Sequence, residues 1–589
     1  MKQTIRIILA LCCLGLNVTH AQTVTTTNWH DAGLRISKPT WINTVNVLDY
    51  GADSSGVLPC DSAFKKALIA LTGKSGNILF PKGTFLFNNT IQINRDSITI
   101  KGAGYDSTKL VFNLAGASKN CIDVVGSIQY ADTSSLSTTA SRNANTVNVY
   151  SASKFAIGDW VMIGMNDSAY FYSSWAYGSL VQLLRINNIS GNTISFESPL
   201  RCTYPISQKP KITQLAVRTT IGIECLKLMR MDATASQTSN INFDKVVNAW
   251  IEGIESDSCN FAHIGLSRCS NIEVNNSYIH QAFAYGGGGQ GYGIAVQDGT
   301  GECKIEGNIF VHLRHSILMQ SGANGNVAAY NYSKDPYWTE PFLPSNSSGD
   351  LVLHGNYPYL NLFEGNINQN AVIDNSHGIN GPFNTFFRNR SETYGVFMNS
   401  GPATDSIQIL GHEVTNSILG LYTLVGNGRV EYANNVKGTT TPSGTSALSI
   451  NSLYLTSGSK PNCPDAYSIF PCINYPNAFN AGSIAAKDRY TRSKMAICSC
   501  EIIPTKVEES HQSSFTTQVY PNPCQQEFYL SGLPAQNIKL KVYNTLGQCI
   551  LNEDQNSRAA IITTNWANGI YWLIVQYGNQ IERLKIVKQ

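Results

Sequence analysis

The chain has 589 residues, of which only 14% are charged, and its 42 basic and 39 acidic side chains leave a formal net charge of +3. So small a charge, with no basic cluster in the sequence, argues against nucleic acid as a partner. Beyond the first 21 residues, no segment approaches the roughly 18 apolar residues that a membrane span needs, so we expect no transmembrane span.

Residues 1–21 have the features of a secretory signal peptide. Lys2 and Arg6 precede an apolar run over residues 7–16, and Thr19 and Ala21 offer small side chains at a cleavage site. The run is too short to cross a bilayer. The sequence therefore predicts an exported protein.

A short helix is expected near the start of the mature chain. Asp61 is a candidate N-cap, and Phe64, Ala67, Leu68 and Leu71 recur at helical spacing on one face. Such an apolar face would cap the open end of a stack of repeats.

A short phrase containing Asn recurs through the middle of the chain. Most of its steps are 22 or 23 residues long, and the positions are Asn275, Asn308, Asn331, Asn366, Asn389, His412 and Asn434. Between these positions lie short runs of Val, Ile, Leu and Phe separated by Gly and Asn, and none is long enough for a helix. Short strands joined by turns, stacked repeat on repeat, explain this pattern. The sequence therefore predicts an all-β fold, a parallel β-helix, over residues 40–500.

Two of the intervals are longer than the rest. The extra residues lie in 284–293 (AYGGGGQGYG) and in 334–350 (KDPYWTEPFLPSNSSGD). Insertions into a stacked repeat become loops on its flank, which is often the binding face. We expect Tyr337 and Trp338 in the second insertion to offer flat apolar faces to sugar rings.

The N-terminal part of the repeat region resembles a known superfamily. Residues 49–52 (DYGA) and 81–85 (PKGTF) are similar to the opening of the pectate lyase superfamily of right-handed β-helices. That superfamily also includes polygalacturonase-like hydrolases and phage depolymerases. The resemblance implies the fold and a polysaccharide substrate, whereas one fold can carry many reactions.

A second set of marks predicts where polar side chains gather. Five glycines each end a short segment in which apolar and polar residues are mixed: Gly299, Gly322, Gly355, Gly378 and Gly401. Aligning these glycines places His354 and His377 side by side on adjacent rungs, about 4.8 Å apart. The neighbouring positions add a polar stripe of Gln297, Gln320, Asp374, Ser376 and Asn399. The alternative is a ladder of polar side chains that only satisfies the turns.

Two reactions compete for these residues. A β-eliminating lyase needs a base, a cation to neutralise the substrate carboxylate, and an acid for the leaving oxygen. The candidate bases are His354 and His377, the candidate cations are Arg388, Arg390 and Lys334, and the candidate acids are Tyr332 and Tyr357. Calcium could bridge substrate carboxylates, although no Asp-x-Asp cluster in the repeats indicates a site for it.

An inverting hydrolase instead needs two carboxyl groups with room for a water between them. The available acids are Asp374, Glu364 and Glu392. Residues 376–378 (SHG) faintly resemble the Gly-His-Gly of polygalacturonases, but the paired aspartates expected two rungs upstream in that family are missing. We therefore favour the lyase slightly.

Further side chains could bind the substrate without reacting. The candidates are Tyr337, Trp338, Tyr357, Tyr359, Gln320 and Asn399. Arg314 and His315 could contribute to the same site, although such a pair more often makes structural hydrogen bonds. The alternative from another class is a non-catalytic glycan-binding or adhesive surface protein.

The C-terminal region differs in composition from the repeats. Residues 501–514 are polar and lack a core pattern, which is typical of a linker. Residues 515–589 alternate short strands with Gly and Asn turns, which predicts a small antiparallel β-sandwich.

The sequence of this sandwich closely resembles a bacterial sorting domain. The matching residues are 520–523 (YPNP), 542–543 (VY) with Gly547, 569–571 (GIY) and 585–588 (KIVK). They are similar to the C-terminal sorting domain of the type IX secretion system of Bacteroidetes. This resemblance implies the type IX machinery as a partner, and passage through the periplasm to the outer surface or the medium. We expect a monomer.

Overall fold

The computed structural model describes residues 29–339, 348–398, 406–426, 428–445, 448–455, 483–497, 517–533, 537–544, 549–556, 559–577 and 580–589. The expected signal peptide, the expected linker and Asn399 lie outside these residues. The chain divides into two compact units, residues 1–501 and 502–589, which are described separately.

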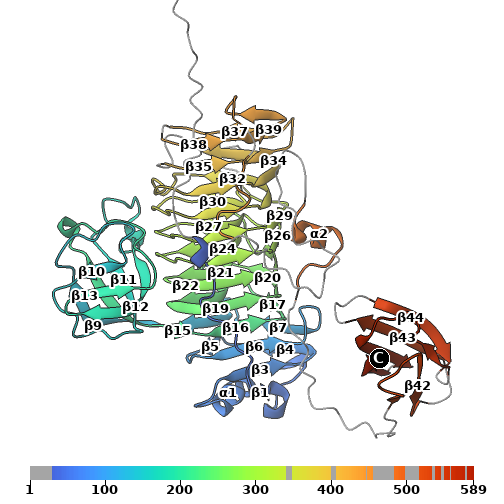
Figure 1. Cartoon of the computed structure of the whole chain (residues 1–589). Coiled ribbons are helices and arrows are strands. Elements are labelled where there is room, and N and C mark those ends of the chain that lie inside the picture. Colours follow the sequence, from blue (N-terminus) through green and yellow to red (C-terminus); the bar gives the residue numbers. More distant parts are fainter. Residues whose placement is uncertain are drawn as a thin grey trace, which may run out of the picture. The chain divides into compact units, whose positions relative to one another are not determined.

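The first unit is a right-handed parallel β-helix, as the repeat predicted (Figure 1). Each turn of the coil contributes one strand to a first sheet and usually two to a second sheet. In the described part of the chain, the first sheet runs in the order β1 (Asn43–Asn46), β3 (Gly76–Phe80), β6 (Ile98–Gly102), β16 (Ile221–Glu224), β19 (Val246–Glu252), β22 (Ser270–Asn275), β25 (Lys304–Glu306), β28 (Val327–Ala329), β31 (Leu362–Glu364), β33 (Thr385–Phe387), β35 (Gln408–Leu410) and β38 (Val430–Tyr432), with β15 (Arg218–Thr219) beside β19.

The second sheet supplies the other sides of the coil. Its strands are β2 (Ser55–Pro59), β4 (Gly83–Phe87), β5 (Ile91–Ile93), β7 (Thr108–Phe112), β8 (Ile122–Val125), β17 (Lys227–Arg230), β18 (Ser239–Asp244), β20 (Glu255–Cys259), β21 (Ala262–Ser267), β23 (Tyr278–Ala282), β24 (Tyr292–Gln297), β26 (Ile309–Val311), β27 (His315–Met319), β29 (Tyr332–Lys334), β30 (Leu351–Leu353), β32 (Ile367–Ile373), β34 (Arg390–Met398), β36 (Glu413–Val414), β37 (Leu421–Thr423), β39 (Asn434–Val436) and β40 (Thr439–Thr441). The strands pair in parallel from rung to rung, except for β39 with β40, which are antiparallel.

The helix α1 (Asp61–Ala70) covers the N-terminal end of the coil. Phe64 and Ala67 are buried, and the Phe64 ring packs against Phe80 with 6.3 Å between centroids. The capping prediction for Asp61 is wrong, because Cys60 is the N-cap and makes no side-chain cap bond. Asp61 is already the first helical residue, and its carboxylate accepts from the amide of Asn88 at 3.1 Å.

The other helices are short. They are η1 (Trp29–Asp31), η2 (Val47–Tyr50), η3 (Ser174–Ala176), η4 (Ile206–Gln208) and α2 (Ala485–Thr491). No helix in the described ranges has both the length and the apolar character needed to cross a membrane.

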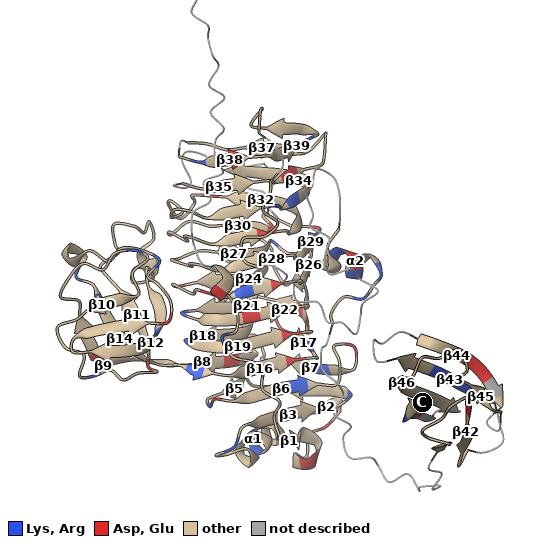
Figure 2. Cartoon of the chain, in the orientation of Figure 1, with Lys and Arg blue, Asp and Glu red and all other residues tan. Residues whose placement is uncertain are grey.

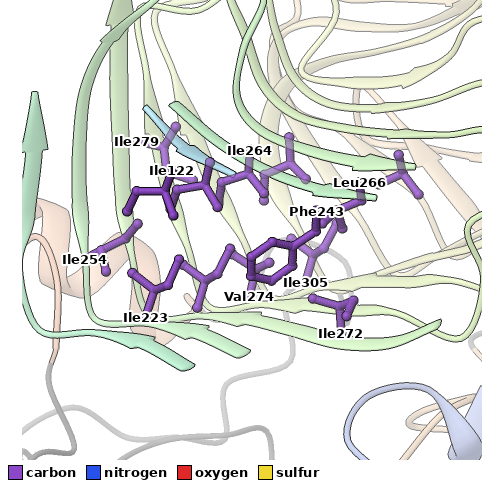
Figure 3. Close-up of a cluster of buried hydrophobic side chains, with 14 of the residues drawn as sticks. Ile122, Ile223, Phe243, Ile254, Ile264, Leu266, Ile272, Val274, Ile279 and Ile305 are labelled. Carbon is purple, nitrogen blue, oxygen red and sulfur yellow. The ribbon is translucent and has the colours of Figure 1, made fainter. Parts of the chain in front are cut away.

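The interior of the coil is a stack of aliphatic side chains (Figure 3). Ile223, Ile251, Val274 and Ile305 occupy the same position on successive rungs of the first sheet, and all four are fully buried. Because each rung buries its apolar face only against its neighbours, one repeat could not be stable alone.

Asparagine side chains satisfy the turns between rungs, which explains the recurring Asn phrase. Asn308, Asn331, Asn366 and Asn389 form a buried column. Each side-chain amide donates to the side-chain oxygen of the next Asn, at 3.0, 2.9 and 2.8 Å. Each of the same oxygens also accepts a backbone N–H at 3.0 Å. The column therefore pairs backbone groups that a tight turn would otherwise bury unpaired.

The sequence analysis did not predict an antiparallel sheet that interrupts the coil between β8 and β15. We call residues 127–216 the inserted domain. Its strands run in the order β10 (Thr146–Asn148), β13 (Thr193–Phe196), β12 (Gln182–Ser190), β11 (Trp160–Gly164), β14 (Lys211–Ala216) and β9 (Ser127–Ser135). It has a hydrophobic core of its own, in which Val161, Leu184 and Phe196 are buried. Figure 1 shows it beside the coil, in cyan and green.

The second unit consists of small antiparallel sheets, as predicted. Their strands are β41 (Gln518–Tyr520), β42 (Glu527–Ser531) and β45 (Ile561–Ile562) in one sheet, and β44 (Cys549–Asn556), β43 (Asn537–Asn544), β46 (Gly569–Tyr577) and β47 (Gln580–Lys588) in the other. Phe528, Leu540 and Leu573 lie in their common core.

Charged residues are interspersed along both units, with blue and red segments mixed rather than separated (Figure 2). This distribution agrees with the low net charge of +3.

Candidate functional site

Polar side chains gather where β27, β30 and β32 end. Met319 lies opposite Leu353, and Leu353 lies opposite Ile373. His354 and Asp374, which directly follow the last two of these residues, therefore sit on adjacent rungs. Both are largely buried, with exposed fractions of 9% and 6%.

Hydrogen bonds connect the polar side chains along this stack. Gln297 Nε2 donates to Gln320 Oε1 at 2.8 Å, and Gln320 Nε2 donates to the carbonyl oxygen of His354 at 2.9 Å. His354 Nδ1 lies 2.5 Å from Asp374 Oδ2. Gln320 is therefore buried, with its side-chain amide already bonded to Gln297 and to the backbone of His354.

The register differs from the glycine alignment used on the sequence. Met319, three residues before Gly322, lies opposite Leu353, two residues before Gly355, so the strands are one residue out of line with the alignment of these glycines. His377 lies in the turn after β32 and not directly opposite His354. The two rings are nevertheless neighbours, with centroids 5.0 Å apart and planes at 73°. His354 and His377 are therefore close, as expected, but His377 reaches His354 from the turn after β32 and not from the opposite position on the adjacent rung.

Asp374 is the charged partner of His354. Burial raises the pKa of its carboxyl group, but the nearby charge and hydrogen bond of His354 and two hydrogen bonds from Ser376 outweigh burial and lower the pKa to about 2. The Ser376 hydroxyl donates at 2.6 Å and its amide at 3.0 Å. An ionised Asp374 fixes the proton of His354 on Nδ1, and this leaves Nε2 as the basic nitrogen.

Two further histidines flank His354. The ring of His315 lies 5.5 Å from that of His354, and the ring of His377 lies 5.0 Å from it. Burial lowers the pKa of His315 and of His377, and the charge of Arg314, together with that of His354 when it is protonated, lowers both further. Both rings therefore stay neutral near pH 7.

Arg314 brings a buried cation to the same place. Its guanidinium lies 3.9 Å from the centroid of the Trp338 ring and 5.5 Å from that of Tyr292. Its Nη1 donates to the carbonyl of Gly286 at 2.8 Å. Arg314 Nε, His315 Nε2 and Trp338 Nε1 are buried atoms with no hydrogen-bond partner among the described residues. Buried polar groups are normally paired, so these atoms call for a water or a polar ligand as partner.

The two insertions meet beside Arg314, as expected for loops on the flank of the coil. Tyr285 of the first insertion packs against Tyr337 of the second, with 4.9 Å between ring centroids. Tyr337 also stacks on His312 at 4.5 Å, and 41% of it remains exposed. The loops thus hold Tyr337 against His312 and Trp338 against Arg314.

The inserted domain also reaches the histidines, and nothing in the sequence indicated this contact. Ser173 Oγ lies 3.2 Å from His377 Nδ1, and the Trp175 ring lies 5.7 Å from the His377 ring. Asn356 Oδ1 accepts the amides of Tyr172 and Ser173 at 3.2 and 3.1 Å. These partners are about two hundred residues apart in the sequence, outside any repeat interval, so periodicity could not pair them.

Two of the arginines proposed as carboxylate ligands lie elsewhere. Arg388 donates to the carbonyls of Leu448 and Ile450, at 2.9 and 2.7 Å. Arg390 Nε donates to Glu413 at 2.7 Å. Arg388 follows a strand of the first sheet and Arg390 begins β34, whereas His354 follows the end of β30, so neither arginine joins the histidines.

The remaining candidates are dispersed or buried. Tyr359 is 1% exposed and packs with Phe171 and Leu180 of the inserted domain, so its role is packing. Tyr357 is partly buried, and its ring lies 5.1 Å from that of Tyr170. Lys334 is exposed at the end of β29, where it pairs with β26.

Glu364 lies inside the protein, away from the histidines. It is fully buried and accepts hydrogen bonds from the Leu453 amide at 2.8 Å and the Tyr330 hydroxyl at 3.3 Å. Burial raises its pKa from 4.5 to about 7. Glu364 therefore contributes to the pH dependence of the free energy of unfolding.

The folded protein keeps the Glu364 proton over a pH range in which the unfolded chain has lost it. The contribution of this group to stability therefore falls as the pH rises from 4.5 to about 7. Glu364→Gln, which mimics the protonated form, is expected to remove this part of the pH dependence. Urea unfolding at pH 4.5 and above pH 7 measures it, with Glu197→Gln in an exposed ion pair as the control. Equal pH dependence in wild type and Glu364→Gln would contradict the assignment.

One group of side chains has the spacing of metal ligands. The ligand atoms of Glu255, Asp257 and His280 lie within 4.8 Å of one another. The ammonium group of Lys227 already lies 2.7 Å from Glu255 and 3.0 Å from Asp257. One ammonium group thus offsets part of the charge of the two carboxylates, and this group of side chains does not include the histidines described above.

Two family descriptions match parts of the sequence. Residues 44–193 match "Rhamnogalacturonase A/epimerase, pectate lyase-like", and residues 518–589 match "Secretion system C-terminal sorting domain". No curated protein matches the chain. The pectate lyase-like and sorting-domain resemblances noted in the sequence are both confirmed. The sorting domain directs the chain through type IX secretion to the outer surface or the extracellular space.

Several solved structures are distantly similar. The tailspike gp49 of Pseudomonas phage LKA1 is 14% identical over 67% of this chain and 77% of its own, with a TM-score of 0.46. The gp54 tailspike of Acinetobacter baumannii bacteriophage AP22 is 13% identical over 66% of each chain, with a TM-score of 0.42. An exopolygalacturonase from Thermotoga maritima is 11% identical over 69% of this chain and 94% of its own, with a TM-score of 0.32.

Proposed function

We propose that this exported, pectate lyase-like β-helix protein cleaves a uronate-containing polysaccharide by β-elimination. The observation that carries the proposal is the arrangement of three side chains. His354 is oriented by an ionised Asp374, and Arg314 with an unpaired Nε lies in the same buried cluster. The pectate lyase-like family description for residues 44–193 supports a glycan as the substrate.

Each group has a defined part in the reaction. His354 Nε2 removes the proton from the carbon beside the uronate carboxylate, and the electrons of that C–H bond form the new double bond. The bond to the glycosidic oxygen breaks, and the leaving oxygen takes the proton back from the His354 imidazolium. Arg314 pairs with the carboxylate and stabilises the negative charge that develops on it. Asp374 stabilises the imidazolium between the two proton transfers.

The same residues are a poor match for hydrolysis. An inverting hydrolase needs one carboxyl group protonated and a second one ionised, with a water between them. Asp374 stays ionised and is bonded to His354, Glu364 is buried under residues 448–455, and Glu392 pairs with Lys487 at 2.5 Å. The three acids considered for hydrolysis are thus in separate places.

A product assay on the full mature chain separates the possibilities. The protein is incubated with a panel of uronate-containing polysaccharides, and ultraviolet absorbance of unsaturated ends is recorded together with reducing ends. A rise in both supports elimination. Reducing ends alone would indicate hydrolysis, and binding without products would indicate a glycan-binding protein.

Arg314→Lys is expected to lower kcat/KM on a free uronate substrate by about 10²-fold, because an ammonium group cannot reproduce the guanidinium pairing. The loss should be smaller on the methyl ester of the same polysaccharide, which has no carboxylate to neutralise. Arg185→Lys on the inserted domain, in an exposed ion pair with Glu197, is the matched control. Equal losses on ester and acid would contradict the role of Arg314.

A further inference from the structure

A turn of the inserted domain presents aromatic side chains to solvent beside the histidines. Between β11 and β12, Tyr172, Trp175 and Tyr177 are 74%, 55% and 49% exposed. Single exposed apolar residues are common, but three within six residues next to a polar cluster need an explanation.

This turn is held rigidly. The buried carboxylate of Asp167 accepts the amides of Gly178 at 2.9 and 3.0 Å and of Leu180 at 2.9 Å. Ala176 is fully buried, in a cluster that includes Tyr359 of the coil. Trp175, in η3 beside Ala176, is therefore exposed on a fixed backbone. A surface that is already ordered loses little entropy when it binds a ligand.

The turn is also docked on the segments that carry the histidines. Asn356 accepts two of its backbone amides, and a Cβ at Gly378 would lie 2.5 Å from Tyr172 Cβ, which shows how closely the two segments approach. Trp175 thus adjoins His377, and Ser173 bonds the same ring.

The turn is uncharged over residues 168–180. Its exposed surface therefore offers flat apolar faces, whereas Arg314, which packs against Trp338, offers a charge. Aromatic faces of this kind bury the apolar C–H face of a ring without needing a charge on it. The aromatic turn and Arg314 are thus suited to different sugar rings of one polysaccharide chain.

We propose that Trp175 is a sugar-binding platform, a subsite for an uncharged pyranose ring next to the uronate that is cleaved. This inference rests on the proposed function for the identity of the neighbouring sugar. It implies a mixed polysaccharide substrate, in which the uronate at Arg314 is followed by a neutral ring at Trp175.

The test separates binding from chemistry. Trp175→Ala is expected to raise KM about 10-fold on the cleaved polysaccharide with kcat within about twofold of wild type. Trp175→Phe, which keeps an aromatic face, should recover most of the loss. Tyr150→Ala is the matched control, because Tyr150 is a 71% exposed aromatic residue elsewhere on the inserted domain. Its KM should not change.

Calorimetric binding of uronate-containing oligosaccharides to His354→Ala keeps the inference testable if the wild type cleaves nothing. Adding Trp175→Ala to this variant should raise Kd about 10-fold for oligosaccharides with a neutral ring, and less for pure uronate oligomers. An unchanged KM and Kd would overturn the inference and leave the proposed reaction intact. A fall in kcat at constant KM would also overturn it, since Trp175 would then act on His377. Absence of binding to every oligosaccharide would overturn both proposals.

Discussion

His354→Ala is expected to lower kcat by about 10²- to 10⁴-fold on the polysaccharide that the wild type cleaves, because it removes the group that moves the proton. Asp374→Asn should produce a loss in the same direction, since an amide cannot stabilise the imidazolium that forms on His354. Initial rates of double-bond formation at saturating substrate measure both effects. KM should change much less than kcat, because neither side chain is assigned to substrate binding.

The control for this experiment is a second histidine paired with a carboxylate. His280, on β23, has its Nε2 3.0 Å from Glu255 of β20 and is not part of the histidine cluster. His280→Ala should leave kcat within about twofold of wild type, since the contacts it removes, with Glu255 and the Tyr278 ring, lie outside the histidine cluster. Wild-type kcat in His354→Ala, with the fold intact by circular dichroism, would eliminate the proposed site.

Asn366→Ala is expected to lower the free energy of unfolding by about 3–5 kcal/mol, because it leaves several buried polar groups unpaired. The Asn366 side chain accepts from the amide and the side chain of Asn331, and donates to the carbonyl of Ala328 and the side chain of Asn389. Urea unfolding followed by circular dichroism measures the loss.

The matched control is an asparagine on a strand outside the column. Asn188 in β12 is exposed, so Asn188→Ala should change the free energy of unfolding by no more than about 0.5 kcal/mol. Equal effects of the two substitutions would show that the column is not a stabilising element. Asn366 lies outside the catalytic groups, so any activity that survives at low temperature should show a normal KM.

The repeat phrase was sufficient to predict the coil, because its physical cause is local and recurs. Every rung needs an apolar residue such as Ile305 inside and an amide such as Asn308 at the turn. The same regularity located the two insertions, and their meeting beside Arg314 is a consequence of where they leave the coil. The N-cap of α1 was less predictable, because Asp61 is a common N-cap residue type and lies only one position after Cys60, the residue that is the N-cap.

The candidate site was only partly predictable. Residues close in the repeat, such as His354, Asp374 and His377, were identified on the sequence and do come together. Arg388 and Glu364 fall in the same stretch of sequence but lie away from this cluster. Successive strands within one turn of the coil lie on different sides, so nearness in the sequence does not fix the side of the coil.

The sequence by itself determined the β-helix, the export domain and the two histidines, because periodicity and motifs record interactions between neighbouring repeats. Only the tertiary structure decided that Asp374 orients His354, that Arg314 is the cation of the cluster, and that Ser173 and Trp175 reach His377. The physical reason why the sequence did not reveal these contacts is that they join separate parts of the chain: the inserted domain, the two loops and three rungs of the coil. Their side chains meet through packing across long sequence separations, for which a single sequence has no periodic signal.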